Sequence, residues 1–373
     1  MIHGSCFKRH WQHGAARFPV RGLVILLGIV CALSASSALF AVTIDTVPVG
    51  NPGNAPDPLT GNLYGAVSYD YRIGKTEVTN SQYTEFLNLK AASDPLGLYN
   101  IQMDDDSLRG GISRSGSDGS YVYTTKTNMG NKPVNFVSWY DAARFANWLN
   151  NGQGSGDTET GAYTLLGGTP TPTNYPITRN LGATWFLPSE DEWYKAAYHQ
   201  PAEQGGDGDS YWLYPTRSNS APTLATADAS GNISNPGVNV ANYLDGASWN
   251  GLINFTTVGS AGPLSDSFYG TADQGGNLYE WNEATDPWSF PSVRGGSINV
   301  TSGGLESGPG YQLDPASEVG YGVGFRVATV PEPGTAVLAI IGCALIWCST
   351  AIRPRAPRRC MRGSPRSPAR PRC

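Results

Sequence analysis

Three short helices, each marked by its own N-terminal cap, constrain the fold of this chain more than any other feature. In each, a Thr or Ser stands three residues before a side chain that can bond back to the helix start, which is the spacing of a capping box. The pairs are Thr79 with Gln82, Ser138 with Asp141, and Ser189 with Glu192. Apolar side chains follow each cap at the three and four spacing of one helix face. Because short strand patterns and turns lie between the helices, the sequence predicts an α+β fold.

The segments between these helices predict short strands and loops. Residues 67–73 alternate and predict a strand before the first helix. Residues 42–66 are rich in Pro, Gly and Asn, so we expect an extended N-terminal segment that adds an edge strand. The Gly, Ser and Asp turns of residues 110–123 predict a hairpin. Residues 151–173 and 201–237 are rich in Gly, Thr, Asn and Pro and are predicted to be surface insertions.

Both ends of the chain carry targeting patterns. Basic residues precede an apolar run and small residues follow it, which predicts a secretory signal peptide over residues 1–41. The alternative is a retained N-terminal anchor. Near the other end, residues 334–352 form a mostly apolar run just long enough to span a bilayer as a transmembrane helix. The arginine-rich tail 353–373 is expected to stay in the cytoplasm.

The C-terminal segment also resembles a sorting signal. Val-Pro-Glu-Pro, the apolar span and the basic tail follow one another over residues 330–373. This order resembles the PEP-CTERM signal of exopolysaccharide-producing Gram-negative bacteria. The resemblance implies an exosortase-type protease as a partner, which removes an inner-membrane anchor and releases the domain to the cell surface or extracellular matrix. The alternative is a plain C-terminal membrane anchor.

The region between the targeting segments is acidic and lacks cysteine. From Val42 to Glu332 it holds 30 Asp and Glu but 13 Lys and Arg, a net charge of about −17. This balance argues against a nucleic-acid partner, because neutralising phosphates needs clustered cations. All six Cys lie in the terminal segments. A loop-rich exported domain without disulfides needs another form of cross-link, and calcium is the one we expect.

Six motifs in order carry a family resemblance. The N-terminal half contains KTEVTNSQYTEFLN, PVNFVSWYDAARFANWLN and ATWFLPSEDEWYKAAYH, and the C-terminal half contains GGNLYEW, RGGS and GFR. Over residues 67–329 the chain therefore resembles the formylglycine-generating enzymes, whose domain is also called the sulfatase-modifying-factor domain. The resemblance implies a loop-rich variant of the C-type-lectin-like fold, with few short helices and short antiparallel strands.

The reactive positions of that family are replaced in this chain. Enzymes of the family that oxidise a sulfatase cysteine carry one reactive Cys three residues after the RGGS serine and another five residues further on. Here Ser297 is that serine, and Val300 and Leu305 stand at the two cysteine positions. Copper-dependent thiol oxidation needs a thiolate as nucleophile and soft-metal ligand. We therefore expect no catalytic residue, no copper and no iron, and Ser297 keeps only a structural role.

Histidine chemistry is restricted as well. His199 is the one histidine of the exported region, whereas an iron site of the facial-triad type needs two. It closes the third predicted helix, so we expect a C-terminal cap or a partner of the helix dipole. The chain also lacks the GxSxG elbow of serine hydrolases.

A calcium loop is the metal site that the sequence favours. Calcium takes six to eight oxygen ligands from carboxylates, amides and carbonyls. In DQGGNLYE, the predicted ligands are the side chains of Asp273 and Glu280 and the carbonyls of Gly276 and Leu278. These positions match one calcium site of the family. The alternative is that both carboxylates belong to a turn and a strand without metal.

The resemblance implies a second calcium site. It maps to the Asn242 side chain, the Tyr243 carbonyl, the Asn250 side chain and the Leu252 carbonyl. Asn250 stands where an Asp is usual, so this site loses a charge and is expected to bind more weakly. Here too the alternative is a set of turn residues without metal.

Other polar and aromatic groups are weaker candidates. The acidic clusters Asp104–Asp106 and Asp207 with Asp209 do not fit the EF-hand spacing and are expected to be solvated loops. Most tryptophans fall within the helix motifs and are expected in the core. Four aromatic residues in irregular stretches are candidates for a sugar- or peptide-binding surface: Trp212, Trp249, Tyr269 and Trp288.

Three functions are compatible with these patterns. We favour an exported, non-catalytic binding or matrix module that is stabilised by calcium and meets an extracellular polysaccharide or a surface protein. The first alternative is a formylglycine-generating oxidase or another metal-dependent enzyme of the same family. The second is a calcium-dependent glycan-binding module, which requires exposed aromatic residues near the metal loop.

Overall fold

The computed structural model describes residues 41–284, 289–308, 310–316 and 322–330. The predicted signal peptide, except for its last residue, the predicted membrane span, the basic tail and Trp288 lie outside these ranges. Within the ranges, no helix is both long enough and apolar enough to cross a membrane. The chain divides after Val330, and everything below concerns the part that ends there.

All three predicted helices form, and each starts at its predicted cap. Helix α2 spans Asn80–Lys90, α3 spans Trp139–Asn150 and α4 spans Glu190–Tyr198. In each, the capping hydroxyl accepts the backbone N–H of the third helical residue, whose side chain accepts the backbone N–H of the cap. Two donors that the helix leaves free are thereby satisfied at every start. The capping-box predictions are confirmed.

The described strands include two four-stranded sheets. The first has the order β1-β2-β14-β5 and is antiparallel throughout. Its strands are β1 (Thr46–Val49), β2 (Tyr71–Gly74), β14 (Ala328–Thr329) and β5 (Trp185–Phe186). Strand β1 occupies an edge, with Val47 opposite Ile73. The edge strand expected from the N-terminal segment is therefore present.

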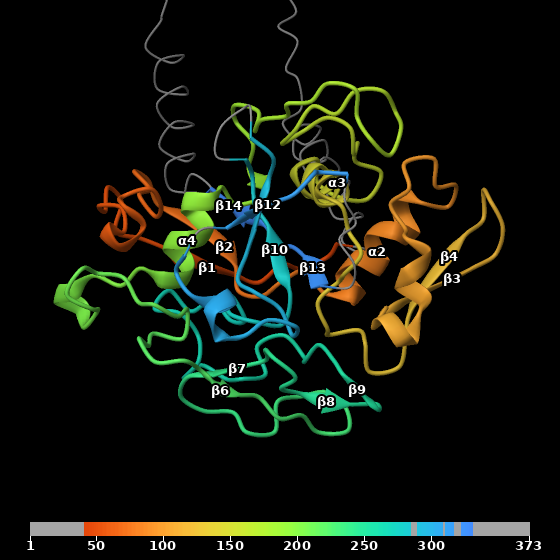
Figure 1. The fold of residues 1–373 in the computed structure, drawn as a ribbon. Helices are drawn as coiled ribbons and strands as arrows, with labels where there is room; N and C mark the ends of the chain where they lie inside the picture. Colours follow the sequence, from red (N-terminus) through yellow and green to blue (C-terminus); the bar gives the residue numbers. More distant parts are fainter. Residues whose placement is uncertain (1–40, 285–288, 309, 317–321, 331–373) are drawn as a thin grey trace, which may run out of the picture. The chain divides into compact units, whose positions relative to one another are not determined.

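The second sheet has the order β12-β11-β10-β13, and its β10–β13 pair is parallel. Its strands are β12 (Tyr311–Gln312), β11 (Ser292–Arg294), β10 (Tyr279–Trp281) and β13 (Val323–Gly324). Figure 1 shows β10 between α4 on one side and α2 and α3 on the other. Tryptophan N–H groups fix this placement: Trp193 of α4 donates to Glu280 in β10, and Trp281 donates to the Val137 carbonyl before α3.

Three two-stranded pairs complete the described strands. The antiparallel pair of β3 (Ile112–Ser115) and β4 (Val122–Thr125) confirms the predicted hairpin. The pair of β6 (Thr223–Leu224) and β7 (Val240–Ala241) is parallel. The pair of β8 (Ser248–Trp249) and β9 (Leu252–Ile253) is antiparallel. Many short strands and three short helices agree with the predicted α+β class.

The strand predicted over residues 67–73 forms only in part. Val67, Tyr71 and Ile73 are buried as the alternation requires, but Tyr69 is 43 % exposed and β2 begins only at Tyr71. The Tyr69 hydroxyl donates to Glu192 Oε1 at 2.7 Å. A polar partner therefore holds this aromatic side chain at the surface, and the apolar period breaks there.

Aromatic residues fill the core between α2, α3 and the C-terminal strands. Phe86 of α2 lies with its ring centroid 5.3 Å from those of Phe145 and Trp148 of α3. Phe145 meets Phe325 edge-on at 5.4 Å. All four side chains are fully buried. Edge-to-face contacts of this kind add to the energy of burial, and they fix both helices against the segment that carries the GFR motif.

Candidate functional site

A buried ion pair stands at the centre of the predicted calcium loop. Arg326 donates through Nε to Glu280 Oε2 at 2.5 Å and through Nη2 to Glu280 Oε1 at 2.6 Å. Trp193 Nε1 donates to the same Oε2 at 2.7 Å. All three side chains are fully buried. Protein donors therefore engage both oxygens of the carboxylate that the sequence assigned to calcium.

The same arginine joins several backbone segments. Its Nη1 donates to the carbonyls of Gly74, at the end of β2, and of Lys75. Its Nη2 donates to the Ala272 carbonyl, just before the loop. A guanidinium offers five N–H donors in a fixed plane, and here they connect β2 and the segment before residue 273 to β10. The GFR arginine thus positions the loop.

Two further carboxyl groups lie against this pair. Glu77 is buried, and its Oε1 accepts from Asn277 Nδ2 at 3.2 Å, whereas its Oε2 has no partner within the described residues. Burial, together with the nearby charges of Asp273 and Glu280, raises the pKa of Glu77 well above its usual value. Asp273 Oδ2 accepts the Gly259 N–H at 2.5 Å. Burial raises the pKa of Asp273 to about 6.

The charges of this cluster do not balance by themselves. Glu77, Asp273 and Glu280 together face one guanidinium, that of Arg326, so the fully ionised cluster carries two negative charges in excess. Buried carboxylates need a proton, a cation or donors to offset the loss of water. The cluster can therefore hold protons or a hard cation. The sequence did not single out Glu77 as a site residue. The available indication was an acidic side chain next to Val78 and Thr79, in a motif that predicts a buried segment.

The first predicted calcium set fits the structure only in part. Asp273 lies in the loop at a left-handed φ of 60° with one oxygen on Gly259. The Gly276 N–H donates to the Gly295 carbonyl, and the Leu278 side chain packs in a small apolar cluster. Glu280 faces Arg326 instead of an open coordination position. In the described ranges, no three His, Cys, Asp or Glu side chains are arranged to hold a metal ion.

The second predicted set is spread over two environments. Asn242 is buried, and its Nδ2 donates to the Asn254 carbonyl and to Asn277 Oδ1. The Tyr243 carbonyl accepts the Gly246 N–H. Asn250 lies instead in the exposed turn between β8 and β9, the strand that begins with Leu252. The residue that reaches Asn242 is Asn254, a contact that the motif spacing did not indicate.

The two positions that carry cysteine in the family oxidases belong to an apolar cluster. Leu305 ends a 3-10 turn, Ser302–Leu305, and is fully buried with Tyr214, Ala241 and Tyr243. Val300 packs against the same cluster. Ser297 is buried, and its hydroxyl accepts the Asn299 N–H at 3.4 Å. The structure thus brings Val300 and Leu305 together, but in contact with rings and methyl groups.

His199 occupies the C-terminal cap position of α4, as predicted. Its Nδ1 lies 2.8 Å from the Tyr269 hydroxyl, and its ring stacks on the Tyr269 ring. Burial, with the nearby Lys195, lowers the pKa of His199 to about 4. The imidazole is therefore neutral at neutral pH, so of the two expected roles the cap is the one that the structure supports.

Two of the aromatic candidates for a ligand surface form hydrogen bonds within the protein instead. Trp249 is 5 % exposed, and its Nε1 donates to the Phe255 carbonyl. Trp212 is half-buried and donates to Gln200 Oε1. These hydrogen bonds are those expected of structural tryptophans.

A comparison with models of protein families tests the family resemblance that the motifs indicate. The model of the sulfatase-modifying factor enzyme 1-like domain matches residues 65–330. The chain belongs to this family. The α+β fold with short helices and short strands is the fold expected for the sulfatase-modifying factor family. A search of curated proteins finds no significant match.

Several solved structures are similar to this sulfatase-modifying factor domain. CarF is 23 % identical with a TM-score of 0.47, over 78 % of this chain and 99 % of that one. Treponema denticola variable protein 1 is 17 % identical with a TM-score of 0.43, over 78 % and 96 %. PvdO from Pseudomonas aeruginosa is 17 % identical with a TM-score of 0.39, over 78 % and 93 %.

Proposed function

We propose that the chain is an exported, non-catalytic member of the sulfatase-modifying factor family that acts as a binding or matrix module. The observation that carries the proposal is the environment of Leu305, which is fully buried among Tyr214, Ala241 and Tyr243. An aliphatic side chain cannot supply the thiolate that copper-dependent oxidation needs. The position therefore contributes packing energy in place of chemistry.

The ends of the chain support the cellular part of the proposal. A signal peptide exports the domain, and the PEP-CTERM-like segment holds it at the inner membrane until an exosortase-type protease releases it to the surface or matrix. There the acidic domain meets an extracellular polysaccharide or a surface protein. Fractionation of cells with and without the protease tests this step: release that is independent of the protease contradicts the sorting role.

Calcium completes the proposal as a stabilising ligand. The excess negative charge of the cluster around Arg326 supports it, and so does Glu77 Oε2, which has no partner among the residues that the structure describes. Asp273 and Glu77 are the carboxylates that would hold the ion, since Glu280 is bonded to Arg326. A ligand that binds only the native state raises its stability by mass action, so EGTA should lower the melting temperature. An unchanged melting curve contradicts calcium binding.

The function itself is tested with the substrate of the family oxidases. The exported region is incubated with a CxPxR peptide, copper and oxygen, and the peptide is analysed by mass spectrometry. We expect the cysteine to remain unmodified. Conversion to formylglycine overturns the non-catalytic proposal and favours the oxidase alternative.

A further inference from the structure

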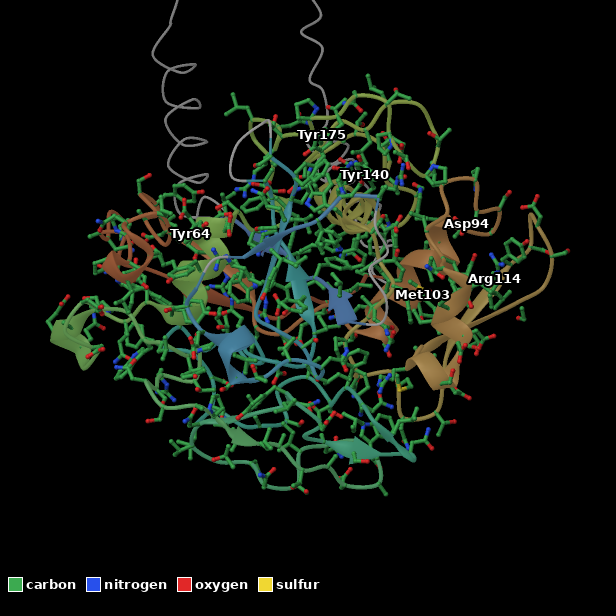
Figure 2. The ribbon with its side chains drawn as sticks, in the orientation of Figure 1. Tyr64, Asp94, Met103, Arg114, Tyr140 and Tyr175 are labelled. Atoms are coloured by element: carbon green, nitrogen blue, oxygen red, sulfur yellow. The ribbon has the colours of Figure 1, made fainter. Side chains whose placement is uncertain are left out.

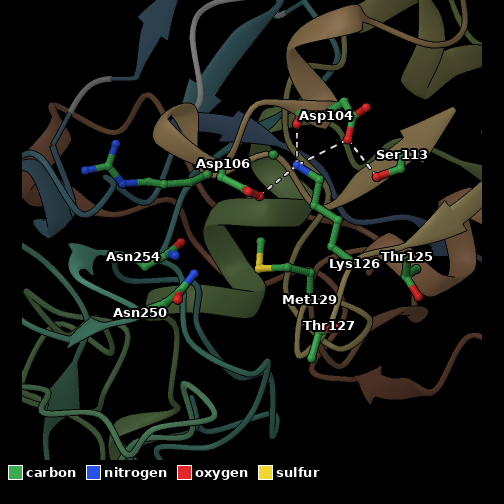
Figure 3. Close-up of a pocket in the computed structure, with 11 residues that line it drawn as sticks. Asp104, Asp106, Ser113, Thr125, Lys126, Thr127, Met129, Asn250 and Asn254 are labelled. Atoms are coloured by element: carbon green, nitrogen blue, oxygen red, sulfur yellow. Dashed lines mark hydrogen bonds and ion pairs between the residues drawn. The ribbon is translucent and has the colours of Figure 1, made fainter.

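A polar cavity of about 490 Å³ opens between the β3–β4 hairpin and the β8–β9 hairpin. Its size lies in the range of small-molecule sites. Figure 3 shows its walls, which come from the two 3-10 turns before β3, from the segment after β4 and from the β8–β9 region. Among the side chains that line it, Met129 is the one apolar group; the polar ones include Asp104, Asp106, Lys126, Asn250 and Asn254.

One wall of this cavity is acidic: it carries Asp104 and Asp106, and Lys126 binds both of them. Lys126 Nζ lies 2.9 Å from Asp106 Oδ1 and 3.4 Å from Asp104 Oδ1. The Ser113 hydroxyl donates to the same Asp104 oxygen at 2.6 Å. Within the described residues, no donor reaches the Oδ2 atom of Asp104 or Asp106. Each carboxylate is therefore held in place by one oxygen and offers the other to a ligand. Both residues are exposed, as expected for a solvated loop, but their ion pairs with Lys126 were not predicted.

The acidic wall is firmly attached to the fold. Met103, in the first of the two turns, is buried, and a Cβ at Gly110 would lie 2.3 Å from the Met103 carbonyl oxygen. Arg114 of β3 packs over the rings of Tyr99 and Tyr121 at 4.7 and 4.4 Å. Figure 2 shows Met103 and Arg114 on this side of the molecule. These contacts hold the backbone of the wall in place, and a wall that is ordered before binding reduces the entropy lost when a ligand binds.

The opposite wall supplies amide groups. Arg109 Nε donates to the Ile253 carbonyl at 2.5 Å and so connects the two sides of the cavity. Asn254 is buried and lines the cavity, and its Oδ1 accepts the Phe255 N–H. Asn250 lines the cavity from the exposed turn. This wall offers amide donors opposite the carboxylate acceptors.

From these observations we propose that the cavity binds an uncharged saccharide, an inference that rests on the proposed binding function and gives its ligand class. The charges of Asp104 and Asp106 balance those of Arg109 and Lys126, so the cavity selects no ion by net charge. A sugar hydroxyl both donates and accepts, so it can satisfy the free carboxylate oxygens and the amide donors at once. The polar lining disfavours an apolar ligand, because the carboxylate oxygens that face the cavity would lose their water.

The proposal is tested by screening the exported region against neutral and acidic oligosaccharides, with and without EGTA, and by measuring the Kd of the best neutral ligand. We expect neutral saccharides to bind equally well in EGTA. Asp106→Ala should weaken binding at least about tenfold, since it removes a charged acceptor. Asn250→Gly should also weaken binding. Glycine is chosen because Asn250 has a positive φ of 53°, which glycine adopts without strain. Glu203→Ala is the matched exposed carboxylate outside the cavity, and it should leave the Kd unchanged.

Three results overturn the inference: binding of acidic saccharides alone, an equal loss with Glu203→Ala, or no saccharide bound at any tested concentration. Melting curves of the three variants check that each is folded. The peptide oxidation assay on the same preparation separates this failure from that of the proposed function. A sample that neither binds sugar nor oxidises the peptide contradicts the saccharide site while leaving the non-catalytic role intact.

Discussion

Arg326 and Glu280 form a fully buried, two-hydrogen-bond ion pair between the GFR and GGNLYEW motifs. The two residues are 46 positions apart in the sequence. Two of the family motifs therefore meet in one contact, which joins β10 to the segment that leads into β14. This relationship gives both motifs a structural role that does not depend on oxidase chemistry.

Removing one member of this pair should strongly destabilise the domain. Glu280→Gln removes the carboxylate that bonds directly to the buried Arg326 guanidinium, and breaking a buried ion pair typically lowers the free energy of unfolding by about 3–5 kcal/mol. Asp106→Asn is the control, because the Asp106 side chain is 83 % exposed although its partner Lys126 is mostly buried; a pair with a solvent-exposed member contributes about 1 kcal/mol or less. Urea denaturation measures both. Equal losses contradict the central role of the pair.

Leu305 should contribute packing energy at its position. Leu305→Ala removes a fully buried side chain, and truncations of this kind lower the free energy of unfolding by about 2–5 kcal/mol. Leu59→Ala, at a leucine that is 69 % exposed, should change it by less than about 0.5 kcal/mol. A Leu305→Ala variant as stable as the wild type would mean that the side chain is not packed as described.

Gly276 should tolerate no side chain. It has a φ of +93°, and a Cβ would lie 2.4 Å from the Asn242 carbonyl oxygen. Gly251 provides the control, since its φ is +76° and no heavy atom lies within 4 Å of its Cβ position. Gly251→Ala should cost about 1–2 kcal/mol through backbone strain alone, and Gly276→Ala should cost clearly more because the strand segments must move apart. Thermal melting of both variants measures the two losses, and equal losses would mean that backbone strain alone, without steric overlap, acts at Gly276.

His199 should make stability depend on pH in a defined window. Burial holds its folded pKa at about 4, below its ordinary value of 6.5. In the unfolded chain the ring takes up a proton as the pH falls below 6.5, whereas in the folded state it stays neutral down to about 4. Its contribution is therefore present above pH 6.5 and is lost as the pH falls towards 4. Wild type should lose more stability over this window than His199→Gln, and parallel curves would refute this.

The local features of the fold were predictable from the sequence. The caps Thr79, Ser138 and Ser189 each act within three residues of themselves, so spacing alone located the helix starts. The hairpin of residues 110–123 was equally local, because its turn residues lie between its own strands. Short-range hydrogen bonds and turn preferences are encoded where they act.

The partners of charged residues were not predictable in the same way. Glu280 looked like a calcium ligand because its loop is rich in oxygen, but its partner Arg326 comes from another motif. Asn277 reaches Glu77 across 200 residues, and no pattern in either segment indicates the contact. Asp104 and Asp106 are exposed as expected, but their partner Lys126, which follows a hairpin, was not predicted. In each case the tertiary fold, and not the local spacing, selects the partner.

The most direct test of the account is a single reaction vessel that contains the exported region, copper, oxygen and a CxPxR peptide. Oxygen uptake is recorded while the peptide mass is followed, and an active enzyme of the family serves as the positive control. The account predicts no uptake above the protein-free rate and a peptide cysteine that stays a thiol. Formation of formylglycine with matching oxygen uptake would contradict the claim that Val300 and Leu305 have replaced the chemistry of this site.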